Sequence, residues 1–205
     1  MTKKIEVEIR GPITERKFED LNKLFKKDGT FLSEKDRIVL CYPDPESGSL
    51  VEDVNTDVRI RTTNGIPELN VKQGKWGGNE SRREFSLVGK NGEFDKMVMM
   101  MAAMGFKTGV LAVRKGKVYQ YKDIEFSLVE VPHHSYYFEA EMMVGDEKDI
   151  ENAQKKMRKT CANLDLEVWD DKGFYEYINK LNSESNEDFD FKNYKEGNFA
   201  KRFGI

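Results

Sequence analysis

The sequence predicts an α+β protein built on an antiparallel β-barrel with a charged interior and helices packed on its apolar outer surface. Three observations support this fold class: short segments that alternate charged and apolar residues, amphipathic segments between them, and turn signals that separate them. The alternative is a β-sandwich whose charged faces are exposed to solvent, because half-exposed strands also alternate. The barrel is favoured because the polar faces carry almost nothing but glutamate, arginine and lysine.

The alternating segments are each as long as a strand, and their charged side chains share one face because the side-chain period of a strand is two. Residues 5–10 place Glu6, Glu8 and Arg10 on one face and three aliphatic residues on the other. The pattern recurs at residues 58–61, 69–72, 82–87 and 138–141. Their polar faces carry Arg59, Arg61, Lys72, Arg82, Glu84, Glu139 and Glu141.

Four amphipathic segments supply the helices that would cover such a barrel. Apolar residues recur at helical spacing over residues 14–27, 93–104 and 147–164, and a fourth helix is expected over about 171–183. The predicted boundary residues are Thr14 as the N-cap of the first helix, Gly105 as the end of the second, and Asp170 or Asp171 as the N-cap of the fourth.

Turns and a change of composition divide the chain. Asn64-Gly65 lies between two alternating segments and predicts a two-residue hairpin. From about residue 184 the chain is polar with spaced aromatic residues, which is typical of a strap packed on a folded domain. We therefore expect a barrel over residues 1–146, with C-terminal helices and an aromatic-rich tail packed on it over residues 147–205.

Composition excludes several classes of protein. A chain of 205 residues, 38% hydrophobic and 35% charged, can bury a sizeable core. The net charge of −3 argues against a general nucleic-acid or membrane-surface role. No apolar run approaches the ~20 residues of a membrane span, and the first residues lack a signal-peptide pattern. Cys41 and Cys161 lie far apart and match no metal-ligand spacing, so we expect a reducing, cytoplasmic environment. We also expect a monomer or homodimer with a small-molecule partner.

The charged faces carry the residue types that a triphosphate requires. Such a group has roughly four negative charges at neutral pH and needs several converging arginine and lysine side chains. Mg²⁺, which bridges phosphate oxygens, prefers a few carboxylates plus water. The glutamates of the first and last strands would hold the ion if barrel closure brings these two strands together. The basic wall would comprise Arg10, Arg59, Arg61, Lys72 and Arg82.

The opening Glu6-Val7-Glu8-Ile9-Arg10 resembles the ExExK signature of the CYTH superfamily, the triphosphate tunnel metalloenzymes. This superfamily includes class IV adenylyl cyclases and thiamine, inorganic and RNA triphosphatases. The resemblance continues in order over residues 4–143. Arg59-Ile60-Arg61 is similar to the RxR strand of the family, and Lys72 is similar to the lysine that follows it. Arg82-Arg83-Glu84 is similar to the RxE strand, and Glu139-Ala140-Glu141 is similar to the closing ExE.

The resemblance implies an eight-stranded antiparallel barrel with a triphosphate in its tunnel. It also implies one or two Mg²⁺ or Mn²⁺ ions on Glu6, Glu8, Glu139 and Glu141, which would be the catalytic residues. Arg10, Arg59, Arg61, Lys72, Arg82 and, with less support, Arg114 would contact phosphate. Glu84 would orient a cation by pairing with Arg82.

Three positions depart from the family pattern. Arg10 replaces the signature lysine, which keeps the charge but changes its reach and donor geometry. The later KxR pair falls on Arg114 and Gly116, so one cation is missing unless Lys115 or Lys117 supplies it. The aspartate that precedes the closing ExE is replaced by Val129, and the neighbouring Glu130 lies on the other strand face.

Two further features allow more than one interpretation. Trp76 follows Lys72 in a glycine-rich loop, where it could stack on a base at a barrel mouth or fill that mouth as an apolar plug. His133-His134 would put adjacent side chains on opposite faces, which indicates a polar loop in preference to a metal site.

Metal-dependent hydrolysis of a triphosphate-containing substrate is the favoured function, because it demands least of the site. The substrate could be a nucleoside triphosphate, inorganic triphosphate or thiamine triphosphate. A class IV-type nucleotidyl cyclase, which forms a cyclic nucleotide and pyrophosphate, is the alternative and would need a base-and-ribose pocket. A third possibility is a module that binds a nucleotide or polyphosphate without turnover, which the departures at Gly116 and Val129 favour.

Overall fold

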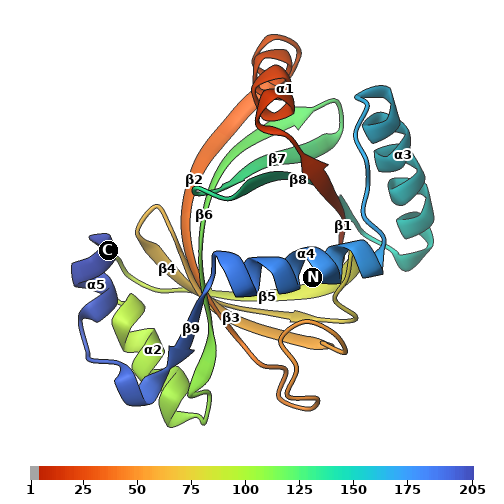
Figure 1. Ribbon diagram of the computed structural model, residues 1–205. Helices are drawn as coiled ribbons and strands as arrows, with labels where there is room; N and C mark the ends of the chain where they lie inside the picture. Colours follow the sequence, from red (N-terminus) through yellow and green to blue (C-terminus); the bar gives the residue numbers. More distant parts are fainter. Residues whose placement is uncertain (1–4) are drawn as a thin grey trace.

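The computed structural model describes residues 5–205 and shows an antiparallel β-barrel surrounded by helices (Figure 1). The strands are β1 (Ile5–Ile13), β2 (Thr30–Tyr42), β3 (Thr56–Thr63), β4 (Ile66–Gln73), β5 (Asn79–Val88), β6 (Thr108–Tyr121), β7 (Ile124–Val131), β8 (Ser135–Val144) and β9 (Glu187–Asp190). Eight of them follow the order β2-β3-β4-β5-β1-β8-β7-β6, and pairing of β2 with β6 closes the barrel. The predicted eight-stranded fold is confirmed.

Barrel closure determines which motifs meet. The first strand, β1, lies between β5 and β8, so the opening and closing glutamate segments are adjacent although about 130 residues separate them in sequence. Cα register pairs Glu8 with Glu141, Arg10 with Glu139, and Glu6 with Arg82.

Four of the five α-helices in residues 5–205 lie where the amphipathic segments predict them, and the fifth lies in the C-terminal tail, where no helix was predicted. They are α1 (Glu15–Asp28), α2 (Phe94–Ala103), α3 (Ile150–Asn163), α4 (Asp171–Glu184) and α5 (Asn198–Phe203), with 3₁₀ turns η1 (Glu147–Asp149) and η2 (Phe191–Asn193). Thr14 caps α1 by accepting a hydrogen bond from the Lys17 amide at 3.1 Å, and Asp170 caps α4 through the Gly173 amide at 2.7 Å. The third predicted helix begins with η1 instead of an α-helical turn.

Two hydrophobic cores lie outside the barrel wall. One packs α1 and α3 against β1, β7 and β8, and its members include Phe25, Phe138 and Met157. The other packs α2, β9 and α5 against β2 and β3, with Ile60 and Phe199 among its buried residues. The apolar strand faces therefore point outward and pack against the helices, and charged side chains line the barrel interior.

The predicted hairpin at Asn64-Gly65 is confirmed, since it joins β3 to β4. Both residues have positive φ, 52° and 82°, which is the requirement of the hairpin turns that suit strand twist. Beyond α3, the chain runs back along β1, and the Trp169 amide donates to the Arg10 carbonyl at 2.9 Å. Contact with this segment is close, because a Cβ at Gly11 would lie 1.9 Å from the Glu167 carbonyl oxygen.

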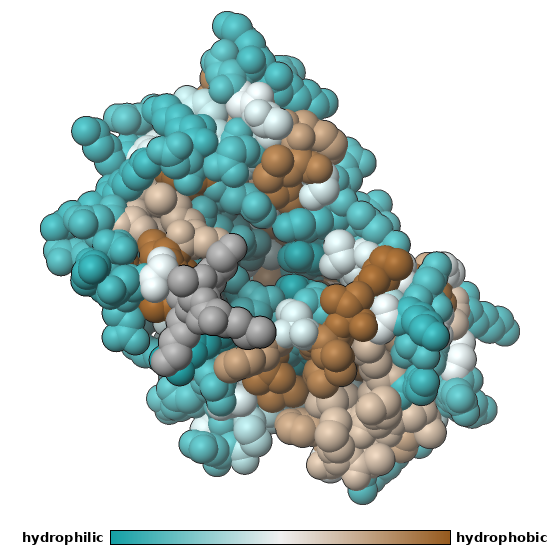
Figure 2. Space-filling model, turned by 180° about the vertical axis from the view of Figure 1, so that it is seen from behind, coloured by the Kyte–Doolittle hydropathy of each residue, from teal (hydrophilic) through white to brown (hydrophobic). Residues whose placement is uncertain are grey.

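The segment after α3 leads into α4, which crosses in front of the barrel opening in Figure 1. Figure 2, seen from behind, shows mostly hydrophilic side chains interrupted by a hydrophobic band. The exposed apolar residues of β5 and α2 are Phe85, Leu87, Val88, Met99 and Met100. Within residues 5–205, no helix is both long enough and apolar enough to cross a membrane.

Candidate functional site

A cavity of about 330 Å³ occupies the barrel interior, and charged side chains from seven of the eight barrel strands line it. These side chains are Glu6, Glu8, Arg10, Lys35, Arg37, Asp57, Arg59, Arg61, Lys72, Glu84, Arg114, Glu139 and Glu141. The remaining strand, β7, contributes Ser127 and Val129. Every predicted site residue lines this tunnel except Arg82, which is buried and donates a hydrogen bond to the lining residue Asp57 at 3.0 Å.

Three of the four predicted glutamates form a compact carboxylate group. One oxygen each from Glu6, Glu8 and Glu141 lies within 4.8 Å of the others. Glu139 also lines the tunnel but does not belong to this group. Carboxylate oxygens are the ligands that Mg²⁺ and Mn²⁺ prefer, so these three residues fit a hard divalent cation.

Crowding of these carboxylates shifts their acidity. Burial raises the pKa of Glu6 to about 8 although Lys72 opposes the shift. Burial and the negative charge of Glu8 raise the pKa values of Glu139 and Glu141. Glu8 differs, because Arg10 and Lys72 outweigh its burial and hold its pKa at about 2. The group therefore takes up protons or a cation to relieve its own repulsion.

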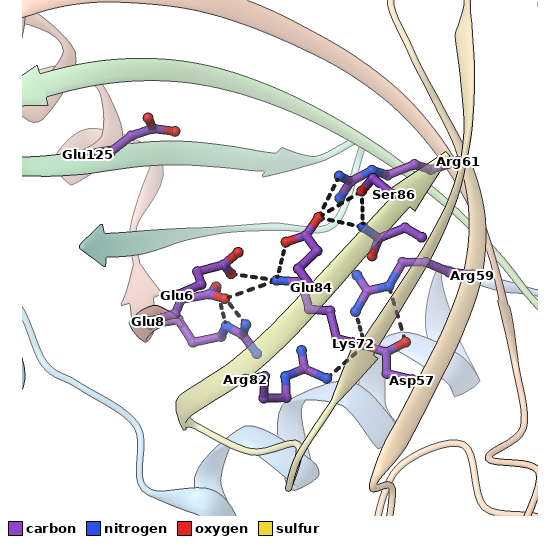
Figure 3. A network of polar contacts seen from close by, with 12 residues as sticks. Glu6, Glu8, Asp57, Arg59, Arg61, Lys72, Arg82, Glu84, Ser86 and Glu125 are labelled. Carbon is purple, nitrogen blue, oxygen red and sulfur yellow. Dashed lines mark hydrogen bonds and ion pairs between the residues drawn. The ribbon is translucent and has the colours of Figure 1, made fainter. Parts of the chain in front are cut away.

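Lys72 of β4 and Arg10 of β1 each contact carboxylates of the tunnel, and Figure 3 shows Lys72 next to Glu6 and Glu84. The Lys72 ammonium lies 2.5 Å from Glu6, 3.5 Å from Glu84 and 3.9 Å from Glu8. The Arg10 guanidinium lies 2.6 Å from Glu8 and is stacked over the Phe174 ring at 4.7 Å. Glu8 is 2% exposed, so this pairing offsets a desolvation cost that an isolated carboxylate would carry.

Glu84 does not pair with Arg82, and that expectation was wrong. Its carboxylate contacts Lys72 and, at 3.3 Å, Arg61. The reason is register: Glu84 lies directly opposite Lys72 in the β4–β5 ladder, whereas Arg82 reaches across to Asp57 of β3. Figure 3 shows Arg59 and Arg82 converging on this aspartate.

Sequence reasoning missed three charged residues that line the tunnel: Lys35 and Arg37 of β2, and Asp57 of β3. In β2 the four consecutive charged residues 34–37 hide the alternation that identified the other strands. Extending the alternation of the Arg59 strand by one step would have found Asp57, which lies two residues earlier on the same face.

The gap at Gly116 is not filled by either lysine beside it. Lys115 is exposed, and the Lys117 ammonium lies over the Phe18 ring at 5.8 Å on the outer surface. Gly116 itself lines the tunnel opposite Lys35, and a Cβ there would meet nothing nearer than 3.8 Å. Val129 also lines the tunnel, so the usual aspartate is absent from the interior at this position.

Aromatic side chains line one end of the tunnel. The Trp169 and Tyr177 rings stack with centroids 4.5 Å apart, and Trp76 meets Phe174 edge-on at 5.0 Å. Trp76 is packed among these rings, which favours the apolar plug over an open stacking platform. His133-His134 forms a loop away from the cavity, where His134 contacts Glu184 at 3.0 Å.

Known structures share this architecture at low sequence identity. A protein from Pyrococcus horikoshii OT3 is 22% identical, with a TM-score of 0.63 over 80% of this chain and 92% of its own. A Vibrio parahaemolyticus protein, provisionally an adenylate cyclase, is 15% identical, with a TM-score of 0.60 over 79% and 89%. A Hippeastrum protein, provisionally an adenylyl cyclase but with dominant triphosphatase activity, is 14% identical, with a TM-score of 0.53 over 80% and 89%.

No protein-family model matches the sequence, and no curated protein matches it. What this chain shares with these solved structures is therefore the fold, a closed antiparallel barrel of eight strands. This is the barrel that the resemblance of the motifs implied.

Proposed function

We propose that this protein is a metal-dependent enzyme of CYTH type that hydrolyses a triphosphate-containing substrate inside the barrel. The observation that carries the proposal is the meeting of a three-carboxylate group with a wall of arginine and lysine side chains in one enclosed cavity. The dominant triphosphatase activity of the similar Hippeastrum protein supports hydrolysis as the reaction.

The carboxylates would hold Mg²⁺ or Mn²⁺. Glu6, Glu8 and Glu141 supply the hard oxygen ligands. Three carboxylates so close together favour an ion with two positive charges. A bound divalent ion would polarise phosphate oxygens and neutralise part of their charge. Glu139 lines the tunnel on the same face of β8 as Glu141, and its carboxylate would orient or deprotonate the attacking water.

Phosphate binding would proceed by exchange of partners. Arg59, Arg61 and Lys72 each contact a carboxylate within the tunnel, so their charges are already paired and oriented. A triphosphate would replace some of these carboxylates as the anionic partner, and divalent cation binding would occupy the released glutamates. Donors held in this way stabilise the charge that spreads over the phosphate oxygens during transfer.

Product analysis tests the proposal. The protein would be incubated with Mg²⁺ or Mn²⁺ and with ATP, tripolyphosphate or thiamine triphosphate, and the products separated. Metal-dependent release of orthophosphate, abolished by EDTA and by Glu6→Ala but retained in Glu130→Gln, supports hydrolysis. Binding without turnover of any substrate would overturn the enzyme proposal and leave a binding module.

A nucleotidyl cyclase is the second candidate, because Trp169 and Tyr177 line the tunnel beside the Trp76 plug and an adenine base can stack on an aromatic ring. The provisional assignment of the Vibrio parahaemolyticus protein agrees with this candidate. Formation of a cyclic nucleotide and pyrophosphate from ATP, in place of orthophosphate, would establish it.

A further inference from the structure

Two arginines face each other on the wall of the tunnel formed by β2 and β6. Arg37 and Arg114 are direct cross-strand neighbours in the β2–β6 ladder, and both side chains line the cavity. Like charges placed directly opposite on a sheet destabilise it. An anion between or above the two guanidinium groups would offset this repulsion.

Neither arginine forms a direct ion pair with a carboxylate that the structure describes. Among the described side chains, which leave out those of residues 1–4, 79 and 80, no carboxylate oxygen lies within 4.0 Å of either guanidinium. The other five lining cations each have such a partner, and even Lys35, next to Arg37 on the same strand face, lies 3.6 Å from Glu125. Arg37 and Arg114 thus differ from the other lining cations in having no described carboxylate at ion-pair distance, although Arg37 still acts on Glu139 through space.

Neutral acceptors hold both side chains in place without neutralising their charge. Arg37 Nε donates to Thr63 Oγ1 at 3.2 Å. Arg114 donates through Nη1 to the Val113 carbonyl at 2.7 Å and through Nη2 to Asn186 Oδ1 at 2.9 Å. A guanidinium has five N–H donors, so most donors of this pair remain for another acceptor. Anchoring by neutral groups orients the fork while leaving the positive charge available.

The pair also lies on the far side of the tunnel from the carboxylates. In the ring of eight strands, β2 is four positions from β1, and β6 is four positions from β5. Arg37 and Arg114 therefore face the wall that carries Glu6 and Glu8. An anion held between these two walls would have two arginines on one side and, on the other, any divalent cation that the glutamates hold.

We propose that Arg37 and Arg114 form a two-arginine anion site that binds a phosphate group of the substrate across the tunnel from the glutamates, with Arg37 supplying the positive charge missing at Gly116. Arg37 is then a substrate-binding residue in its own right. The site rests on the proposed function for the identity of its ligand, a phosphate of a linear triphosphate, but its geometry requires only an anion with several oxygen acceptors.

Calorimetric titration of tripolyphosphate in EDTA, which removes divalent cations, tests the site directly. Arg37→Ala and Arg114→Ala should each weaken binding by about tenfold to a hundredfold, the range for loss of a charge-assisted contact. The double variant should lose less than the product of the two single losses, because both arginines act on one phosphate group. Lys115→Ala, which removes an exposed neighbour of Arg114, and Arg83→Ala on the exposed face of β5 should bind as the wild type does.

A stability measurement separates binding from a structural role. Without anion, the melting temperature of Arg37→Ala should equal or exceed that of the wild type, because the repulsion of a like charge is removed. Arg37→Lys, which keeps the charge without the fork, should bind with intermediate affinity. Wild-type affinity in both alanine variants would overturn the two-arginine site alone, whereas failure of the wild type to bind tripolyphosphate would overturn the proposed function as well.

Discussion

At the scale of single residues, the carboxylates of the tunnel differ in their neighbours and therefore in their pKa values. Glu8 is matched by Arg10 and Lys72, which keep it ionised, whereas burial and neighbouring negative charge raise the pKa of Glu141. Within residues 5–205, Glu141 has no ion pair with a basic side chain. The difference assigns Glu8 a fixed charge and leaves Glu141 dependent on a proton or a cation.

Replacing Glu141 should separate stability from function. Glu141→Gln removes a carboxylate from a crowded anionic group, so the melting temperature without metal should hold or rise. Stabilisation by added Mn²⁺ should shrink, because a ligand of the ion is lost. Differential scanning calorimetry with and without Mn²⁺ measures both, and phosphate release should fall below detection. Glu130→Gln serves as the matched control, and unchanged Mn²⁺ stabilisation in Glu141→Gln would contradict the metal assignment.

Asp44 is a second buried carboxylate, and its role is structural. The side chain is 2% exposed and accepts hydrogen bonds from four backbone amides of the β2–β3 connection, those of Glu46, Ser47, Asn55 and Thr56. Burial raises the pKa of Asp44, but these four donors outweigh it and lower the value to about 2. Asp44 therefore ties the two ends of the connection together only while it is ionised.

The stabilisation from Asp44 should disappear at low pH. Since its pKa is lower in the folded than in the unfolded chain, the contribution is complete above pH ~4 and is lost as the pH falls through 2. Asp44→Asn cannot accept as many hydrogen bonds, so at pH 7 the free energy of unfolding should fall by about 1–3 kcal/mol. Urea unfolding of the variant and the wild type at pH 7 and pH 2.5 measures the difference in their free energies of unfolding. This difference should be smaller at pH 2.5. Asp28→Asn, on an exposed site, should change little at either pH, and an equal effect of both variants would refute this role.

At the scale of elements, the C-terminal segment is fastened to the barrel through one side chain of α2. Asp95 is buried and accepts hydrogen bonds from the Tyr194 hydroxyl, the Phe199 amide at 3.3 Å and the Ala200 amide at 2.8 Å. Both amides belong to the first turn of α5, where a carboxylate satisfies free N–H groups and complements the helix dipole. β9 continues the same attachment by pairing with β6.

Loss of this contact should loosen the segment and leave the tunnel intact. Asp95→Asn should lower the free energy of unfolding by about 1–3 kcal/mol, because buried donors lose a charged acceptor. Hydrogen exchange should accelerate over residues 187–203 and remain slow in β1 and β8. Tripolyphosphate affinity should not change, since no residue of α5 lines the tunnel. Lys96→Gln, one residue away and exposed, is the control, and protection equal to that of wild type would argue against Asp95 as the fastening.

At the scale of the whole molecule, the fold inverts the usual arrangement of a small barrel. The hydrophobic cores lie between the barrel and its helices, and the interior holds ionic groups drawn from seven of the barrel strands. Burying so many charges is costly unless each is paired or reaches water and ligand. The site consequently exists only when the barrel is closed, because its members are scattered through the unfolded chain.

Ligand binding should therefore stabilise the entire barrel. At a tripolyphosphate concentration one hundred times its Kd, the free energy of unfolding should rise by about 2.7 kcal/mol, since the unfolded chain has no assembled site. Thermal unfolding of the wild type at increasing tripolyphosphate measures the effect, and sulfate at matched ionic strength controls for screening. A melting temperature that responds equally to sulfate and tripolyphosphate would mean that the tunnel has no preference for a linear polyphosphate.

Local sequence patterns were enough to predict which side chains share a strand face and where the first four helices lie. Alternation placed Glu6, Glu8 and Arg10 together because the period of a strand is a property of the backbone, and the caps Thr14 and Asp170 follow from local hydrogen bonding. Motif order predicted the barrel through resemblance. These features depend on residues that are near one another in the chain.

Which of these faces meet, and through which atoms, depends on how the barrel closes and could not be read from local patterns. Barrel closure paired Glu84 with Lys72 and Arg61 instead of Arg82, and it brought the unrecognised Arg37 opposite Arg114. Cross-strand register depends on how β2 and β6 close the ring, and four consecutive charged residues in β2 conceal which of them face inward. Local periodicity carries no information on that register, because it is set by packing between strands that are distant in sequence.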